Sequence, residues 1–345
     1  MVIGGGTPDT SIKSFWDGDI QWFTPSEIGK NKYVDCSSRT ISEEGLNNSS
    51  AKLLPPNTIL LSSRATIGEC SISLRECATN QGFQSLMAKD CNTEFLYYLI
   101  QTKKKDLIRK SCGSTFLEIS ANEVRKIQGS VPSDAEQKKI AKLLSLLDER
   151  IAAQNKIIDK LQSLIKGIRH DIFKDIQGEV LTLSNIADIY QPQTISSSDL
   201  TSEGYWVYGA NGIIGKYKEY NHETEQICIT CRGNTCGTVN YTQPKVWITG
   251  NSMVINTDKY QRQVHKRFLF HYLSSYNFKS IVSGSGQPQI VRTPLEKIKV
   301  VLPTIEKQVR IANSIDIVSE KINTESSVLR LLENQKQYLL RQMFI

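Results

Sequence analysis

Val131-Pro132-Ser133-Asp134-Ala135-Glu136-Gln137 is the stretch that decides the fold, because the chain returns to it as Leu302-Pro303-Thr304-Ile305-Glu306-Lys307-Gln308. The two copies lie 171 residues apart (308 − 137), and this offset holds without a gap to the end of the 345-residue chain. It also extends back to Gly113-Ser114 and Gly284-Ser285, before which the copies diverge and gaps are needed. Such an internal repeat predicts that one structural unit occurs twice.

The C-terminal part of each copy is predicted to form a long helix. Ser133 and Glu136 have the spacing of a capping box at the start of the first helix. Apolar residues then recur at alternating intervals of four and three, which predicts a coiled coil. Two amphipathic helices that each pack on their own globular domain are the alternative. The seam positions are Ile140, Leu144, Leu147, Ile151, Gln154, Ile158, Leu161, Ile165, Ile168 and Ile172 in the first helix, and Ile311, Ile315, Val318, Ile322, Glu325, Leu329, Leu332, Lys336, Leu339 and Met343 in the second.

The remaining sequence predicts two globular domains that mix short strands and short helices. Thr58–Leu61 and Gln226–Thr230 have the composition of strands, whereas Phe95–Ile108 and Phe268–Ile281 are predicted to be helical. We therefore expect an α+β protein with a pseudo-two-fold internal repeat. The expected domains are a globular domain at 1–130, a long helix at 131–175, a second globular domain at 176–301 and a second long helix at 302–345.

Composition permits a nucleic-acid partner and argues against a membrane protein. The net charge is +7 at pH 7 with a pI near 8.8, which suits a polyanionic partner without requiring one. No run of apolar residues has the length of a membrane span. The first residues lack the features of an export signal, and the eight cysteines are scattered, so we expect reduced thiols and a cytoplasmic location.

The motifs of DNA-modifying and DNA-cleaving enzymes are missing. Leu54-Pro55-Pro56-Asn57 lacks both the amide before the prolines and the aromatic residue after them that an adenine methyltransferase uses, and no phosphate-binding loop of the P-loop type is present. Glu136-Gln137-Lys138 has the E-x-K form found in nucleases, but it lies in the first turn of a capped helix. We therefore expect no catalysis and no cofactor.

Cys228, Cys231 and Cys236 suggest a zinc site, with His222 as the nearest possible fourth ligand. The alternation of Ile227 and Ile229 in a predicted strand explains these cysteines better as packed or edge thiols. We therefore expect no metal.

Polar side chains beside glycines in both globular domains are the candidates for binding a ligand. Arginine can grip guanine, asparagine and glutamine can grip adenine, and nearby glycines let the backbone approach phosphate. Arg64 and Arg232 take comparable places, and the 171-residue offset matches Asn80-Gln81 with Gly250-Asn251-Ser252. For each residue alone, a turn or a strand-end hydrogen bond is the alternative. The candidates are Thr24, Ser63, Arg64, Gln81, Ser114 and Thr115 in the first domain, and Arg232, Asn234, Asn251 and Gln287 in the second.

Four local patterns carry a resemblance to a known family. They are Gly4-Gly5-Gly6-Thr7-Pro8 with Gly18–Ser26, Leu61–Gly68, Tyr208–Gly215, and Pro132-x3-Glu136-Gln137-x2-Ile140. Together with the repeat, they resemble the specificity subunits of type I restriction–modification systems over essentially the whole chain.

The resemblance implies two target-recognition domains, at 1–130 and 176–301, separated by two conserved helices that form an antiparallel coiled coil. It further implies that the chain binds double-stranded DNA at a bipartite, asymmetric target and assembles with two modification (methyltransferase) subunits and with restriction (endonuclease and translocase) subunits. A DNA-binding regulator that acts without partners and a purely structural scaffold are the alternatives.

One departure from the family pattern concerns the segment that leads into each domain. The second domain is preceded by residues 178–189, Gly-Glu-Val-Leu-Thr-Leu-Ser-Asn-Ile-Ala-Asp-Ile, whereas the first begins almost at its glycines. We therefore expect the first domain to lack a strand that the second one has.

Two polar residues interrupt the apolar seams at equivalent positions, Gln154 and Glu325 (325 − 154 = 171). In an antiparallel pair with aligned midpoints they would be offset by about one helical turn. We expect them to hydrogen-bond across the coiled coil and fix its register. The alternative is that each side chain reaches solvent.

Overall fold

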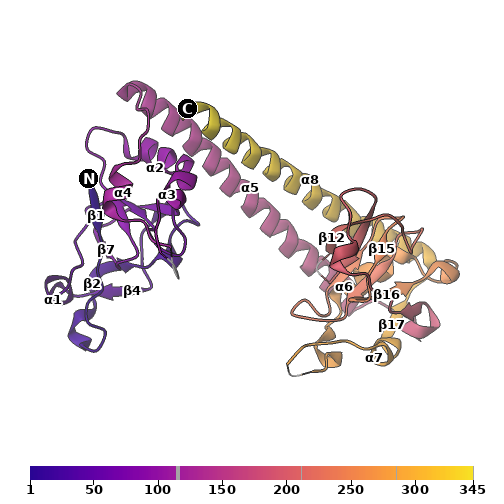
Figure 1. Cartoon of the computed structure of the whole chain (residues 1–345). Helices are drawn as coiled ribbons and strands as arrows, with labels where there is room; N and C mark the ends of the chain where they lie inside the picture. The colour runs from indigo at the N-terminus through magenta and orange to yellow at the C-terminus, as the bar shows by residue number, and fades with distance from the viewer. Residues whose placement is uncertain (114–116, 211, 285, 345) are drawn as a thin grey trace. The chain divides into compact units, whose positions relative to one another are not determined.

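The computed structural model describes residues 1–113, 117–210, 212–284 and 286–344. The chain forms two compact units, here called unit 1 (Met1–Asn155 with Val328–Ile345) and unit 2 (Lys156–Ser327). Each unit combines one globular domain with part of each long helix (Figure 1). This division differs from the four consecutive domains expected from the sequence, because each long helix is shared between the two units.

Unit 1 begins with a mixed domain of short strands and helices. Its strands are β1 (Val2–Gly4), β2 (Trp16–Phe23), β3 (Tyr33–Val34), β4 (Arg39–Ile41), β5 (Ile59–Leu61), β6 (Cys70–Ser73), β7 (Cys77–Thr79) and β8 (Gln84–Leu86). Its helices are α1 (Glu43–Asn47), α2 (Thr93–Thr102), α3 (Lys104–Arg109), α4 (Ala121–Arg125) and the start of α5 (Asp134–Lys174), with 3-10 turns η1 (Lys13–Phe15) and η2 (Pro25–Glu27).

Unit 2 repeats this mixture. Its strands are β9 (Glu179–Thr182), β10 (Asp188–Tyr190), β11 (Tyr205–Gly209), β12 (Gly212–Tyr217), β13 (Ile227–Thr230), β14 (Val239–Tyr241), β15 (Trp247–Ile248), β16 (Ser252–Asn256) and β17 (Lys299–Leu302). Its helices are α6 (Lys266–Ser275), α7 (Arg292–Glu296) and the start of α8 (Ile305–Met343), with 3-10 turns η3 (Leu183–Asn185), η4 (Ser197–Asp199), η5 (Asp258–Tyr260) and η6 (Phe278–Ile281).

The two globular domains share one sheet topology. The main sheet has the order β1-β8-β5-β6-β3 in unit 1 and β10-β16-β13-β14 in unit 2, so its first four strands correspond one to one. The smaller sheets, β4-β2-β7 and β12-β11-β15, also correspond, since each has one antiparallel and one parallel pair around its central strand. The repeat predicted from the sequence is therefore a repeat of the fold, although the strand sequences have diverged.

The predicted strands are confirmed, and the predicted short helices are each interrupted. β5 and β13 occupy the runs expected to be extended, and both are fully buried. The helix expected at Phe95–Ile108 is divided at Lys103 into α2 and α3. The one expected at Phe268–Ile281 ends at Ser275, after which η6 follows.

The long helices are antiparallel, as each unit shows separately. In unit 1, Leu144 near the start of α5 shares a buried core with Leu340 and Phe344 at the end of the chain. In unit 2, Phe173 near the end of α5 and Ala312 near the start of α8 belong to one core. The start of one helix thus lies with the end of the other in both units, which confirms the antiparallel α+β fold. Each fully buried apolar side chain contributes roughly 1.5–3 kcal/mol to this packing.

The segment that leads into the second domain forms a strand that has no counterpart among the described residues of unit 1. β9 pairs with β17 in an antiparallel ladder, for example Leu181 with Val300. The residues of unit 1 equivalent to β17 by the 171-residue offset, 128–131, are exposed and lie outside the strands. The expected difference between the two domains is present in the structure.

Candidate nucleic-acid interface

Arg64 lies just beyond the central strand β5, where a backbone bridge holds it in place. Its backbone pairs with that of Glu118, which also pairs with Cys112. Next to this bridge, the Ile119 amide donates to the Ser63 carbonyl at 3.0 Å. The Arg64 Nε lies 2.9 Å from Glu118 Oε1, and the two side chains are 43% and 38% exposed. The main-chain bridge therefore fixes the backbone of Arg64, while its guanidinium pairs with Glu118 and stays partly exposed.

Arg232 has the same surroundings in unit 2. Its backbone pairs with that of Gln289, which also pairs with Ser283, and the Ile290 amide donates to the Cys231 carbonyl at 3.0 Å. Gln289 stands where unit 1 has Glu118, so the acidic neighbour of the first arginine is replaced by a neutral amide.

The structure corrects one pairing that the constant offset predicted. The Ser63 amide donates to the Gly82 carbonyl at 2.8 Å, and the Cys231 amide makes the same bond to the Asn251 carbonyl at 3.0 Å. Asn251 therefore corresponds to Gly82 (251 − 82 = 169) and not to Asn80. The offset fails here because the loops between the two strands differ in length, whereas the helices that define it do not.

Two further candidates of unit 1 adjoin Arg64. Gln81 is exposed and accepts a hydrogen bond from the Thr7 hydroxyl at 2.5 Å. The Thr24 hydroxyl donates to Glu27 at 2.6 Å in a capping box, so its first role is to fix the turn at Pro25. A Cβ placed on Gly82 would lie 2.9 Å from Pro25, which shows how closely these loops approach.

The other candidates of the first domain have different positions. The Ser63 side chain is fully buried, and its hydroxyl has no hydrogen-bond partner among the described residues. From that position it cannot contact a ligand at the surface, so the expectation that Ser63 binds DNA is wrong. Ser114 and Thr115 lie outside the described residues.

The candidates of unit 2 gather around Arg232. Asn234 is exposed in the turn that the Cys236 amide closes on the Gly233 carbonyl at 3.0 Å. The Gly233 amide in turn donates to the Pro288 carbonyl at 3.0 Å, which brings the exposed Gln287 to the same place. Gly233 has a φ of +83°, a conformation that favours glycine, so the turn depends on this residue.

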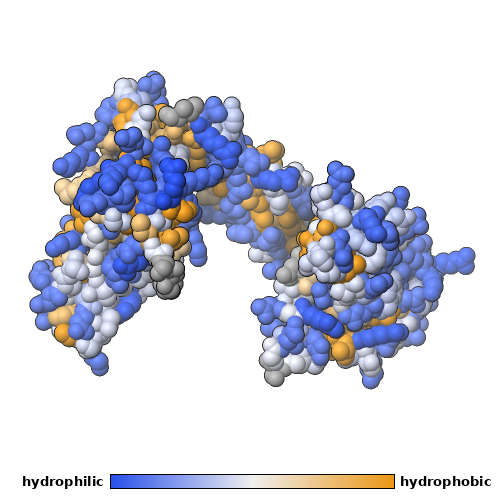
Figure 2. Space-filling model, viewed as in Figure 1, coloured by the Kyte–Doolittle hydropathy of each residue, from blue (hydrophilic) through white to orange (hydrophobic). Residues whose placement is uncertain are grey.

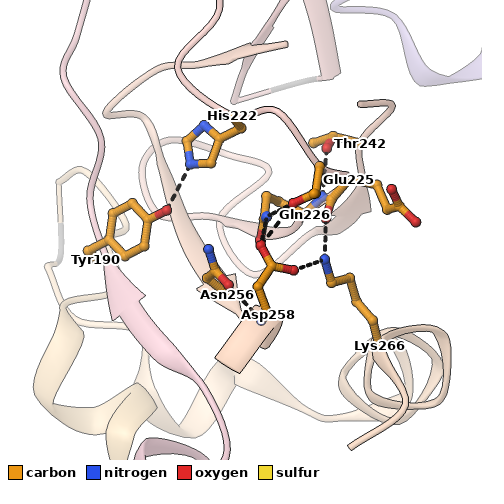
Figure 3. Close-up of polar contacts among 9 residues, drawn as sticks. Tyr190, His222, Glu225, Gln226, Thr242, Asn256, Asp258 and Lys266 are labelled. Carbon is orange, nitrogen blue, oxygen red and sulfur yellow. Dashed lines mark hydrogen bonds and ion pairs between the residues drawn. The ribbon is translucent and has the colours of Figure 1, made fainter. Parts of the chain in front are cut away.

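The thiols and the histidine considered for zinc serve the core of unit 2. Cys228 is fully buried in β13, and burial raises its pKa to about 12. His222 is buried, which lowers its pKa to about 4, so its ring is neutral. The Tyr190 hydroxyl faces His222 and donates to its Nε2 at 2.9 Å (Figure 3). The other ring nitrogen, Nδ1, donates to the Asn221 side-chain oxygen at 2.6 Å. Within the described ranges no three His, Cys, Asp or Glu side chains are arranged to hold a metal ion.

A polar network beside His222 fixes the start of α6. Lys266 donates to the Asp258 carboxylate and to the Glu225 carbonyl, both at 2.6 Å (Figure 3). Partial burial would raise the pKa of Asp258, but the hydrogen bonds from Lys266, Thr224 and Gln226 outweigh it and lower that pKa. The network is structural and lies within unit 2.

Sequence reasoning missed two glutamines that attach the domains to the long helices. Gln137 accepts from the Asn92 amide at 2.8 Å and donates to the Pro132 carbonyl at 2.9 Å. Gln308 makes the equivalent bonds in unit 2, to the His265 amide and the preceding proline carbonyl, both at 2.9 Å. Both side chains are buried. The repeated Pro-x4-Gln pattern was the available signal.

A charged cluster ties α5, α6 and α8 together in unit 2. Asp316 forms an ion pair with Arg267 and accepts from His271 Nε2 at 2.8 Å. Arg169 donates to the other ring nitrogen of His271 at 2.9 Å, and burial lowers the pKa of this histidine to about 4. Partial burial would raise the pKa of Asp316, but its bonds to Arg267 and His271 lower it.

Unit 1 has a smaller cluster at the corresponding place. Asp148 of α5 accepts from the Tyr98 hydroxyl at 2.7 Å and pairs with Lys336 of α8 at 2.6 Å. This ion pair explains the polar break that Lys336 makes in the apolar seam. Gln154 is buried in unit 1, and Glu325 in unit 2 pairs with Lys321 at 2.6 Å. The hydrogen bond predicted between Gln154 and Glu325 stays a prediction.

The surface is mainly polar. Hydrophilic residues make up most of the face of each unit that Figure 2 shows. No helix in the described part of the chain is long and apolar enough to cross a membrane.

Comparison with known proteins identifies the family. The profile of the type I restriction modification DNA specificity domain matches residues 1–163 and 176–334. The MjaIX specificity subunit of Methanocaldococcus jannaschii is 40% identical over 168 residues, which are 46% of this chain and 39% of that protein. The EcoprrI specificity subunit of Escherichia coli is 27% identical over 354 residues, covering 95% of this chain and 87% of the relative.

Solved structures agree with the fold. The S subunit of a type I restriction–modification system from M. genitalium has a TM-score of 0.64 at 18% identity, covering 96% of this chain and 94% of its own. The relatives carry the names of specificity subunits. The chain therefore belongs to the family of type I restriction–modification DNA specificity proteins.

Proposed function

We propose that the chain reads a bipartite, asymmetric double-stranded DNA target for a type I restriction–modification complex. The observation that carries this proposal is the matched pair Arg64 and Arg232, which identical backbone bridges hold beyond the central strands β5 and β13. Both arginines lie among glycine-containing loops with polar side chains. The repeated backbone bridge, here called the frame, places one arginine in each domain. This arrangement suits a duplex with two half-sites.

The two half-sites should differ because the neighbours of the arginines differ. Glu118 beside Arg64 can accept from cytosine while the arginine donates to guanine. In unit 2, Asn234, Asn251 and Gln287 offer amide groups, which suit adenine. In unit 1, Gln81 and Thr24 complete the set of proposed contacts.

The repeat also offers two similar docking surfaces for modification subunits. Leu146 and Ile317 are equivalent (317 − 146 = 171), and each is an exposed apolar residue on a long helix, at 52% and 68% exposure. Because two similar surfaces can each bind one copy of the same partner, we propose two modification subunits per chain. Restriction subunits would join that complex in the cytoplasm.

The long helices set the spacing of the target in this proposal. A coiled coil of about 33 residues is a rod of about 50 Å, and half-sites should lie about 10 base pairs apart, centre to centre. We expect removal of one heptad from each helix to shorten the preferred spacer.

The decisive experiment is co-expression with a modification subunit of a type I restriction–modification system from the same organism, followed by sequencing of the methylated sites. A two-part target with an unread spacer is the expected result. Recovery of a single continuous target, or a spacer that does not change with heptad deletion, would overturn the arrangement.

A further inference from the structure

Two isoleucines are exposed where the hairpin of β11 and β12 meets the candidate interface of unit 2. Ile213 and Ile214 lie close to the start of β12, and each is 47% exposed. A single exposed apolar residue is ordinary at a protein surface. Here two of them are consecutive, so the end of the hairpin presents a small apolar surface. None of the contacts proposed above involves it.

Hydrogen bonds place this end of the hairpin between the two segments that carry the arginine and amide candidates of unit 2. The Thr230 hydroxyl, close before the arginine in the chain, donates to the Ala210 carbonyl at 2.5 Å. The Ser252 hydroxyl, which follows Asn251, donates to the Gly209 carbonyl at 3.3 Å. The apolar surface therefore adjoins the side chains that are proposed to read DNA.

The backbone fixes the apolar surface in place. The pairing of β11 with β12 shifts between Val207 and Tyr208, which leaves Ile214 as the extra residue of a β-bulge. Such bulges re-aim a side chain and are common beside functional sites. A Cβ on Gly209 would lie 2.9 Å from the Ile214 side chain, so the glycine makes room for the isoleucine to lie over it. The fold thus holds the pair in position before any ligand binds.

Unit 1 has a polar turn at the corresponding place. The Phe23 carbonyl at the end of β2 accepts from the Asn80 amide at 3.1 Å. The Tyr208 carbonyl in β11 accepts from the Thr249 amide at 2.9 Å, with the same offset as the loops above (249 − 80 = 169). After this point unit 1 continues into the capping box that begins at Thr24, whereas unit 2 continues into the hairpin with the isoleucines. The two domains therefore offer groups of different polarity at one position of their common fold.

Cations lie beside the apolar pair as well. Lys216 follows Ile214 on β12, and its ammonium lies 4.8 Å from the centre of the Trp206 ring. Arg232 lies on the other side of the hairpin contact described above. Nucleic acid combines anionic phosphates with apolar groups on its base edges, so it matches an apolar surface flanked by cations. This charge pattern and the continuity with the arginine favour DNA as the occupant.

We propose that Ile213 and Ile214 contact the C5-methyl groups of thymines in the half-site that unit 2 reads. The proposal rests on the function proposed above and adds a base preference to it. The thymine methyl lies in the major groove, where arginine and amide side chains also find their base edges, and apolar side chains recognise it by burial. Each buried methyl should raise the affinity about fourfold. Because unit 1 has a polar turn at this position, the preference is expected in one half-site alone.

The test is selection from a duplex library with a randomised interior, bound by the full-length chain in complex with the modification subunit. The library is amplified once with thymidine triphosphate and once with deoxyuridine triphosphate, which removes every thymine methyl and keeps the base pairing. We expect a two-part target with at least one T·A pair in one half-site. In the uracil library the preference at this pair should fall about fourfold for each lost methyl, while the other positions keep theirs.

Protein variants connect the methyl group to the hairpin. I213S/I214S should lose the preference at the same pair in both libraries, whereas I213V/I214V should retain it. Both isoleucines are exposed, so the serine variant should fold. The matched control is V180S, which changes another exposed apolar residue of unit 2 and should leave every position unchanged.

The outcomes separate this inference from the proposed function. A two-part target without a T·A preference, or with the same preference in both libraries, would overturn the inference and leave the proposed function standing. Weaker binding of I213S/I214S that does not depend on the thymine methyl would show that the hairpin holds DNA by another contact, and would also overturn it. A single continuous target would refute the proposed function and this inference together.

Discussion

Replacing Glu118 by Gln gives Arg64 the neutral neighbour that Arg232 has in Gln289. The folded state should barely change. The Arg64–Glu118 pair is close, with Nε 2.9 Å from Oε1, but both side chains are more than one third exposed. Solvent therefore screens the pair, and its contribution to the free energy of unfolding is about 0–1 kcal/mol.

The substitution should change the affinity for DNA measurably, although it barely changes the stability of the fold. If the Arg64 loop faces the duplex, the Glu118 carboxylate lies near a phosphate. At a separation of about 6 Å in water, the repulsion is roughly 0.7 kcal/mol, so E118Q should tighten binding to random-sequence DNA about threefold. Removing the carboxylate also makes the logarithmic salt dependence steeper by about 0.9.

The assay is fluorescence anisotropy with a labelled random-sequence duplex at several salt concentrations. The matched control is the reciprocal change Q289E, which should weaken binding by a similar factor. R64A should weaken it further, by loss of a cation. Unchanged affinity and unchanged salt dependence in both E118Q and Q289E, with both variants folded, would show that these loops do not face DNA.

Three further predictions concern the stability of unit 2 and the register of the long helices. Burial lowers the pKa of His222 and His271 to about 4, so the unfolded chain binds protons at a higher pH than the folded chain does. The free energy of unfolding therefore falls as pH drops from about 6.5 toward 4, by up to about 3 kcal/mol for each histidine. Amide exchange at pH 7 and pH 5 should show this loss in unit 2 and not in unit 1, because all four histidines lie in unit 2. Asp316→Asn leaves Arg267 without its ion-pair partner and removes a negative charge near the partly buried Arg169, so urea unfolding should show a loss of roughly 2–3 kcal/mol; an unchanged midpoint would mean that solvent already compensates both arginines. Replacing both Gln154 and Glu325 by Leu should keep or raise the melting temperature while broadening the accepted DNA spacer; an unchanged spacer preference would contradict the proposed register bond.

The parts of the fold that were predictable are those in which the signal is local. The seam of α5 could be identified because a heptad pattern needs only one helix, and its positions Leu144, Ile158 and Ile165 are indeed buried. The strands β5 and β13 were also recognisable, since a short run of branched apolar residues between turns has few other structures.

The site was less predictable because its contacts join distant residues. The bridge from Arg64 to Glu118 connects positions 54 residues apart (118 − 64), and no local pattern marks the acid as the neighbour of the arginine. The place of Ser63 beside Arg64 suggests a surface contact, but successive side chains of an extended segment point to opposite faces, and the Ser63 side chain is buried. The constant offset misaligned Asn251 for a related reason. Loops can gain or lose residues, whereas an insertion in a packed helix would shift its buried side chains out of register.

The residues that attach the domains to the helices are buried, whereas the candidate DNA contacts lie at accessible positions on loops. Gln137 and Gln308 are buried and make the same two bonds in both units, so a change there would alter how a domain is attached to its helix. Arg64 and Arg232 lie at accessible positions, where substitutions cost little stability. Because main-chain atoms make the bridges that hold these arginines, the bridges survive replacement of the acidic side chain of Glu118. One fold can therefore present different polar groups in its two domains without repacking its core, which is the freedom that the proposed reading of two unlike half-sites requires.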